Sequence, residues 1–251
     1  MRPTARPIVT PFRVLRISGV LFFLYALVFV GSLFVGPGQV GLSACLDALG
    51  SARSPASGGV ADAAPSILLS IRMPRVLFAG TVGAVLSVAG VVFQALLRNP
   101  LADPYILGIS GGAAVGAIVG ILLGAAAVPF GVSGLAFAGA LATLLVIVAV
   151  AGSGRGIRSH TLLLVGVVVN AFFNAVIMFL LAVSDAGDLH SIMFWLMGDL
   201  SLARGRDILT VGAALLAGFV VISLYARPLN VIVTGEETAR SLGVDPETAK
   251  K

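Results

Sequence analysis

The stretch that decides the fold reads VLFAGTVGAVLSVAGVVFQALL, residues Val76 to Leu97. It carries no charged residue, and about 20 apolar residues in a helix cross the hydrocarbon core of a bilayer. The apolar run is continuous and lacks the two-residue alternation of a barrel strand, so it predicts a membrane-spanning α-helix. Gly83 and Ser87 stand four apart, and small residues at that spacing let a second helix pack closely.

The rest of the chain repeats this pattern. Its 251 residues are 58% hydrophobic and 11% charged, and the mean hydropathy of +1.08 is far above that of a soluble domain. We predict an all-α, polytopic membrane protein in which residues 1–16 form a cytoplasmic tail, 17–225 the transmembrane domain and 226–251 a cytoplasmic loop. The six predicted spans cover residues 17–36, 76–97, 106–127, 134–151, 161–184 and 208–225.

The distribution of positive charge predicts the orientation. With a cytoplasmic N-terminus, the inner segments hold eleven of the 16 Lys and Arg residues and the outer segments hold five. Because positive residues concentrate on the cytoplasmic side, this bias favours an N-terminus inside the cell. It also accounts for the net charge of +5, so we expect contact with membrane lipid and no nucleic-acid partner.

The segment GISGG, which begins at Gly108, fits the G-x-S-x-G pattern around a serine nucleophile, Ser110. Such a serine needs a base within hydrogen-bond reach, normally a histidine. The two histidines of the chain, His160 and His190, fall in a predicted inner loop and a predicted outer segment. An intramembrane serine protease is therefore disfavoured, and we expect no catalytic residue in this chain.

The same segment predicts helix packing, because Gly108, Gly112 and Gly116 stand four apart. The sequence has no phosphate-binding G-x-x-x-x-G-K-[ST] motif, and no cluster of His, Cys or carboxylate residues that predicts a metal site. We expect neither a metal nor a cofactor in this chain.

A few polar residues interrupt the apolar spans. Gln94 lies near the inner end of the second span, while Asn170 and Asn174 share one helix face. Amides are costly inside a bilayer unless they have partners. Two interpretations stand together, namely hydrogen bonds between helices and the lining of a polar path.

Arg72 and Arg75 stand three apart on the predicted outer side, in the sequence IRMPR. One interpretation is that they anchor the span by extending their charged ends to the interface. The other is a cationic patch that pairs with acidic residues of an external protein.

Four blocks of sequence, in this order, resemble the FecCD-type permeases of bacterial ABC importers, the family of the vitamin B12, iron–siderophore and haem permeases. The blocks cover most of residues 66–244 and read IRMPRVLFAGTVGAVLSVAGVVFQALLRNPLADPYILGISGGAAVGA, LLLVGVVVNAFFNA, FWLMGDLS and GEETARSLGV. The resemblance implies a multi-pass protein of the bacterial plasma membrane that carries a metal chelate. Ferric siderophore ranks first as the substrate, before haem and cobalamin. A separate subunit would hydrolyse the ATP.

The resemblance also implies roles and partners. Arg72 and Arg75 would receive carboxylates of an extracytoplasmic substrate-binding protein. Ser159 and His160 would lie in the cytoplasmic gate, where this histidine is bulkier than the small polar residues expected. The remaining partners are a second permease subunit, identical or different, and two ATP-binding subunits. The residues implied in docking the latter are Gly235, Glu236, Glu237, Arg240, Leu242 and Gly243.

The chain departs from the family in one respect. Family members have ten spans, whereas six are predicted here, and the sequence stops within the implied docking loop. We therefore expect a fragment or short form that does not transport alone. The alternative is a membrane remnant or scaffold that does not transport at all.

Overall fold

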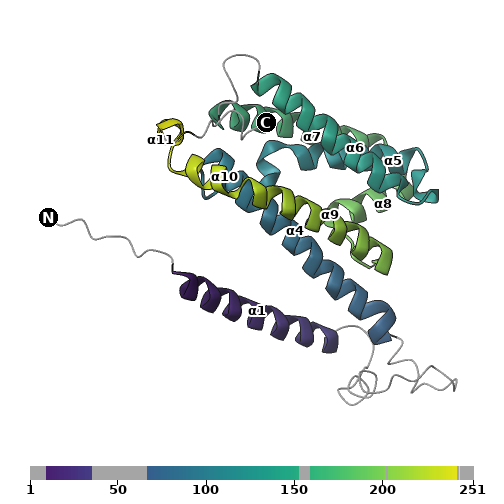
Figure 1. Cartoon of the computed structure of the whole chain (residues 1–251). Helices are drawn as coiled ribbons and strands as arrows, with labels where there is room; N and C mark the ends of the chain where they lie inside the picture. Colours follow the sequence, from purple (N-terminus) through teal and green to yellow (C-terminus); the bar gives the residue numbers. More distant parts are fainter. Residues whose placement is uncertain (1–9, 36–66, 153–158, 202, 242, 244–251) are drawn as a thin grey trace. The chain divides into compact units, whose positions relative to one another are not determined.

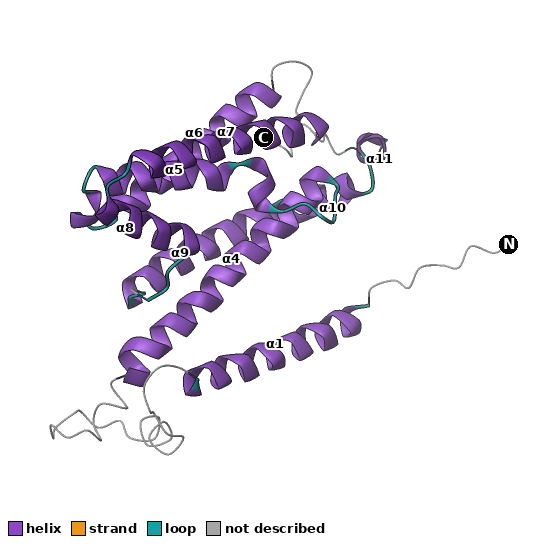
Figure 2. Ribbon diagram, turned by 180° about the vertical axis from the view of Figure 1, so that it is seen from behind, coloured by secondary structure: helices purple, strands orange, loops and turns teal. Residues whose placement is uncertain are grey.

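The computed structural model describes residues 10–35, 67–152, 159–201, 203–241 and 243. Within these ranges all regular structure is helical (Figure 2). Five of the described helices are long and apolar enough to cross a membrane, and they lie at residues 11–34, 68–97, 131–151, 161–183 and 205–224. These findings confirm the prediction of an all-α, polytopic membrane protein.

The chain divides into two compact units. One unit comprises residues 1–80 and 200–208, and the other comprises residues 81–199 and 209–251. The boundaries fall inside α4 (Met73–Leu97) and near the start of α9 (Gly205–Leu224). Each unit is described by itself below.

Helix α1 (Pro11–Phe34) is the longest described element that lies wholly in the first unit. It begins earlier than predicted, because the Thr10 side chain accepts a hydrogen bond from the Arg13 amide at 3.3 Å and Pro11 suits the first helical turn. The C-terminal end of α1 packs through Leu33 on the buried Leu68. The Tyr25 ring lies against Gly80, at a point where a side chain would overlap its hydroxyl.

A π-helical turn, η1 (Leu68–Arg72), leads directly into α4. Pro74 follows this turn and lacks an amide hydrogen, and in a regular α-helix its ring would clash with the carbonyl four residues before it. The wider π turn gives the ring room. The helix therefore starts at Leu68 rather than at the predicted residue 76.

Three helices form the body of the second unit: α5 (Ile109–Leu122), α6 (Gly131–Ala151) and α7 (Ser159–Val183). They pack on one another and lie side by side in both ribbon views (Figures 1 and 2). Helix α5 has more buried residues than α6, and they include the fully buried Ala117 and Ile118.

The predicted span over residues 106–127 is broken at both ends. The regular helix is α5 alone, flanked by the 3₁₀ turns η2 (Pro104–Leu107) and η3 (Ala125–Ala127). Gly108 and Gly124 separate these elements with φ values of 76° and 69°. Left-handed glycines end helical segments, so the apolar run yields a short helix of 14 residues.

Helix α8 (Ala186–Met197) follows α7 and packs on α5, with Ile192 fully buried. Helix α9 follows α8 in the chain. It leads into α10 (Ala226–Val233) and α11 (Glu236–Ser241), which contact each other. Thr234 closes α10, because its hydroxyl donates to the Val231 carbonyl at 2.7 Å.

Candidate functional site

The glycines of α5 lie against the backbone of α6. A Cβ added to Gly112 would overlap the Thr143 hydroxyl and come within 2.8 Å of the Gly139 carbonyl oxygen. A Cβ on Gly139 would in turn overlap the Gly112 carbonyl, and one on Gly116 would overlap that of Leu135. The two backbones are therefore in direct contact, as small residues allow between membrane helices.

The one polar side chain at this contact, Thr143, is buried but has a hydrogen-bond partner. Its side chain is 3% exposed, and its hydroxyl donates to the Gly139 carbonyl of its own helix at 2.7 Å. Because the bond is internal to α6, the α5–α6 contact depends on shape and not on a hydrogen bond between the helices. Neither Gly139 nor Thr143 was predicted from the sequence to pack here, although the GALAT segment carries small residues at the same four-residue spacing.

Gly108 brings α5 and η2 close to the predicted polar pair on α7. A Cβ at Gly108 would lie 3.0 Å from the Asn170 amide nitrogen, and a Cβ at Gly111 would lie 2.9 Å from the Phe173 Cβ. The Asn170 side chain is half-buried, while Asn174, one turn later, is exposed. The structure thus places the two asparagines in different surroundings.

A pocket of about 500 Å³ opens between α5, α6 and α7. Apart from Thr143 its lining is apolar or aromatic and carries no charge. Such a lining suits hydrocarbon or another helix, and it offers no nucleophile or ligand for a charged group. The lining residues outside the glycine contact include Val115, Val119, Ala138, Val146, Val169, Phe172 and Phe173.

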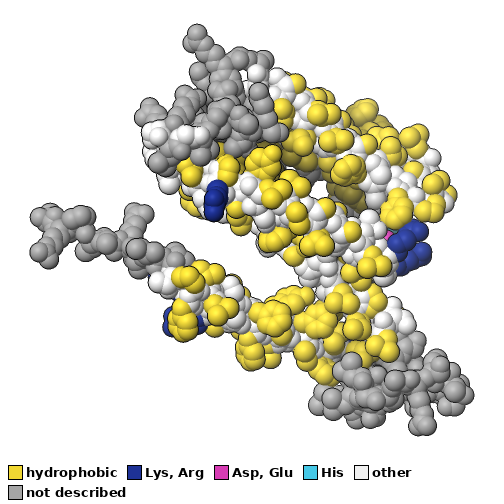
Figure 3. All heavy atoms as spheres, in the orientation of Figure 1, with side chains coloured by type: hydrophobic (Ala, Val, Ile, Leu, Met, Phe, Trp, Pro, Cys, Tyr) yellow, Lys and Arg dark blue, Asp and Glu magenta, His cyan; other side chains and the backbone are white. Residues whose placement is uncertain are grey.

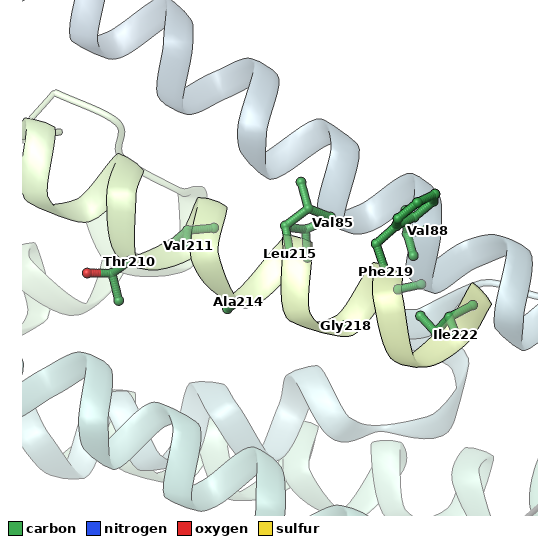
Figure 4. A pocket seen from close by; sticks show the side chains of 10 residues that line it. Val85, Val88, Thr210, Val211, Ala214, Leu215, Gly218, Phe219 and Ile222 are labelled. Atoms are coloured by element: carbon green, nitrogen blue, oxygen red, sulfur yellow. The ribbon is translucent and has the colours of Figure 1, made fainter. Parts of the chain in front are cut away.

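A second apolar groove, of about 300 Å³, runs between α4 and α9 in the second unit (Figure 4). Leu215 and Phe219 of α9 point toward Val85 and Val88 of α4 in this view. Gly83, one of the two residues predicted to pack on a neighbouring helix, would meet no described atom within 4 Å if it carried a Cβ.

Ser87, the other predicted packing residue, donates its hydroxyl to the Gly83 carbonyl at 2.8 Å and is exposed. Among the described residues, α4 therefore faces α9 through its valines and not through the predicted pair. The physical reason is that the valines lie on a different side of the helix from Gly83 and Ser87.

The two arginines of the IRMPR segment differ in burial and in hydrogen-bond partner. Arg72 is only 7% exposed, and its Nη1 donates to the Leu33 carbonyl at the end of α1 at 2.8 Å. Arg75 is exposed, and its Nε lies 3.4 Å from the Leu200 carbonyl oxygen. The structure thus gives different surroundings to the two arginines, which one of the two interpretations of the sequence had placed together in a cationic patch.

The turn after α4 is ordered by its own side chains. The Asn99 side chain accepts from the Leu101 amide at 3.0 Å, and the Asp103 side chain accepts from the Tyr105 amide at 2.7 Å. Gln94 lies just before this turn with its side chain exposed, and its carbonyl accepts from the Asn99 amide at 3.2 Å. Asn and Asp commonly cap turns in this way, which is the signal that could have identified Asn99 and Asp103.

The residues implied in the gate and in ATPase docking are described only in part. Ser159 and His160 begin α7, and Gly235 and Gly243 flank α11 with φ values of 126° and 77°. The side chains of Ser159, His160, Glu236, Glu237 and Arg240, and the whole of Leu242, lie outside the described parts.

The described ranges hold no group of three His, Cys, Asp or Glu residues that could bind a metal ion. What they do hold is a set of long apolar helices with glycine contacts and uncharged pockets. These features define a multi-pass α-helical membrane protein.

Comparison with known proteins narrows this class. The FecCD transport family matches residues 23–251, and the chain belongs to that family. It is 41% identical over 198 residues to the cobalamin import system permease protein of Halobacterium salinarum, covering 79% of this chain and 53% of that protein. It is 38% identical over 198 residues to the hemin transport system permease protein of Yersinia pestis, covering 75% of this chain and 58% of that protein.

A solved structure shares the fold. It is described as a metal-chelate type ABC transporter in an inward-facing conformation, and it matches with a TM-score of 0.72 and 27% sequence identity. The match covers 91% of this chain and 67% of the other. The chain spans about half the length of the curated relatives that it matches.

Proposed function

We propose that this chain is the membrane-spanning part of a permease in an ABC importer for metal chelates. The observation that carries the proposal is the family match over residues 23–251, in a chain whose described helices suit a multi-pass membrane protein. In this proposal the N-terminus is cytoplasmic, and the chain performs no covalent chemistry and uses no cofactor.

The proposed assembly has three kinds of partner. A second permease subunit completes the path, a substrate-binding protein docks on the outer side, and two ATP-binding subunits dock on the segment around α11 (Glu236–Ser241). The order of the helices supports the proposed contact with the ATP-binding subunits. Helices α10 and α11 directly follow the apolar helix α9, so a short helical pair on the inner side would transmit motion of those subunits to the membrane helices.

The packing of α5 suggests how the permease changes shape. Its contact with α6 is made of backbone and small side chains, and the buried Thr143 hydroxyl is satisfied inside α6. Helices that meet in this way can shift against each other without leaving a polar group unpaired in the membrane. We propose that such shifts open the path alternately to the two sides.

The substrate is the finer part of the proposal. We rank ferric siderophore first, with cobalamin and haem as the competing chelates. Relatives with 38–41% identity include permease proteins for cobalamin and for hemin. A further relative, 39% identical, is a probable iron chelatin permease of Helicobacter pylori.

Uptake measurements test the function. Cells that contain the binding protein and ATPase of the same import system would be given labelled ferric siderophore, cobalamin or haemin, with and without this chain. We expect uptake of one chelate to depend on the chain. If no chelate enters in a chain-dependent way and no ATP-binding subunit copurifies, the non-transporting scaffold is the correct alternative.

The inner contact has its own test. Replacing both Glu236 and Glu237 by Lys should remove most of the copurifying ATP-binding subunit, because the double change reverses two charges at the proposed docking segment. Asp188→Lys on α8 is the matched control and should leave copurification unchanged. Normal copurification of the double variant would contradict the docking role.

A further inference from the structure

The pocket between α5, α6 and α7 is lined by one face of each helix. The three helices contact one another, and all of them lie in the second unit. On each helix two lining residues stand four apart, which places both on the same side of that helix. These pairs are Val115 and Val119 on α5, Ala142 and Val146 on α6, and Val169 and Phe173 on α7. The pocket is therefore a product of helix packing and not of a loop.

The lining offers no partner to a charged or strongly polar ligand. Helices α5, α6 and α7 contain no Asp, Glu, Lys or Arg. Thr143 supplies the one polar side chain of the lining, and its hydroxyl already donates to the Gly139 carbonyl at 2.7 Å. A polar group placed here would lose its water without gaining a comparable partner. The pocket therefore suits a hydrocarbon.

The pocket opens onto the apolar surface of the same helices. Two of its lining residues, Val146 and Phe172, are 53% and 63% exposed. Leu145 and Phe179, which do not line the pocket, are exposed as well. Figure 3 shows hydrophobic side chains along the described helices, with Lys and Arg side chains gathered in only a few places. In a multi-pass membrane protein such a surface meets lipid tails, which are as apolar as these side chains, so the pocket is continuous with the lipid-facing surface.

The shape of the pocket favours an acyl chain over a second helix. On α6 the lining extends from Leu135 to Val146, which is about 16 Å at 1.5 Å per residue. The volume of about 500 Å³, spread over about 16 Å, leaves a channel about 6 Å wide, whereas a helix with its side chains is about 10 Å across. One extended hydrocarbon chain fits this channel, and a helix does not.

We propose that this pocket binds one acyl chain of a membrane phospholipid, seated beside the glycine contact of α5 and α6. A chain in the channel meets three helices and gains dispersion contacts that a chain beside a single helix lacks. Since the lining is uncharged, the site recognises the chain and not the headgroup. The inference goes beyond the proposed function and does not depend on it, because it requires only that the three helices lie in a membrane.

Lipid retention tests the proposal. The full chain would be transferred from phosphatidylcholine nanodiscs into detergent, and native mass spectrometry would count the phospholipids that stay bound. We expect the wild type to keep a single phospholipid, and Ala142→Phe and Val146→Phe each to lose most of it, because the added ring occupies the channel. Val148→Phe is the matched control, since Val148 is exposed on the same helix but does not line the pocket, and it should retain lipid as the wild type does.

Three results would overturn the acyl-chain site. The first is a wild type that keeps no phospholipid, or filling variants that keep as much as the control. The second is strong preference for phosphatidylglycerol over phosphatidylcholine with the same chains, which would indicate a headgroup site. The third is a disulfide between two copies of Ala142→Cys, made in a Cys45→Ser background, in place of bound lipid, which would show that a second copy covers the pocket. None of these results bears on chelate uptake, so the proposed function is tested separately.

Discussion

Arg72 supplies a donor that α1 cannot provide for itself. The last carbonyls of a helix have no partner within the helix, and the Arg72 Nη1 meets the Leu33 carbonyl at 2.8 Å. A positive charge is also favourable at the C-terminal end of a helix dipole. This single side chain therefore joins the C-terminal end of α1 to the π turn that precedes α4.

Replacing Arg72 by Met should destabilise the purified chain by about 1–3 kcal/mol, because a buried acceptor loses its charged donor. Thermal unfolding in detergent, followed by size-exclusion fluorescence, measures the change. Arg75→Met is the matched control, since Arg75 is exposed, and its melting temperature should stay near that of the wild type. Equal melting temperatures for the two variants would contradict the anchoring role.

Gly112 occupies a position where no side chain fits. An added Cβ would overlap the Thr143 hydroxyl and lie 2.8 Å from the Gly139 carbonyl oxygen. We expect Gly112→Ala to cost about 1–3 kcal/mol through overpacking, again read from thermal unfolding.

Gly83→Ala provides the comparison for this change. The same methyl group at Gly83 meets no described atom within 4 Å, and alanine favours a helix over glycine by about 0.5–1 kcal/mol. The Gly83 variant should therefore unfold at or slightly above the wild-type temperature. A larger loss at Gly83 than at Gly112 would show that the packing is assigned to the wrong helix face.

Substitutions at the two ends of α5 distinguish the cost of backbone strain from the cost of steric crowding. Gly108 and Gly124 both have left-handed φ values, but a Cβ at Gly124 meets nothing within 4 Å, whereas one at Gly108 lies 3.0 Å from the Asn170 amide nitrogen. Gly124→Ala should cost about 1–2 kcal/mol from strain alone. Gly108→Ala should cost more, and equal losses in a thermal unfolding series would disprove the crowding at Asn170.

The elements show which features a sequence can predict. Long uncharged runs predicted the spans near α4, α6, α7 and α9, because hydrophobic length alone requires them. The start of α4 and the ends of α5 were not predicted. They depend on a π turn before Pro74 and on two left-handed glycines, and hydropathy does not register backbone conformation.

The candidate site was likewise predicted from the sequence only in part. Spacing alone pointed to Gly112 and Gly116, but the partner positions Gly139 and Thr143 follow only from how α5 crosses α6. The spacing of the IRMPR segment did not distinguish Arg72 from Arg75, whereas the structure buries only Arg72.

The orientation of the entire chain can be tested by labelling. In a Cys45→Ser background, which removes the single native cysteine, new cysteines would replace Arg206 or Thr234. A membrane-impermeant maleimide should label the first in intact cells and the second only after permeabilisation. The reverse pattern would place the N-terminus outside.

The shortness of α5 has a consequence for the surrounding bilayer. With 14 residues at about 1.5 Å of rise each, it is about 21 Å long, against a hydrocarbon core of about 30 Å. Buried residues along α5, among them Ala114, Ala117 and Ile118, show that other helices cover much of its surface, and irregular backbone is tolerated at membrane depth where protein covers it. The 25-residue α7 exposes large apolar side chains such as Val168, Phe172 and Phe179. Large apolar side chains of α6 such as Phe137 and Leu145 are exposed as well. Changes in lipid chain length should therefore act on this part of the protein through α6 and α7 more than through α5.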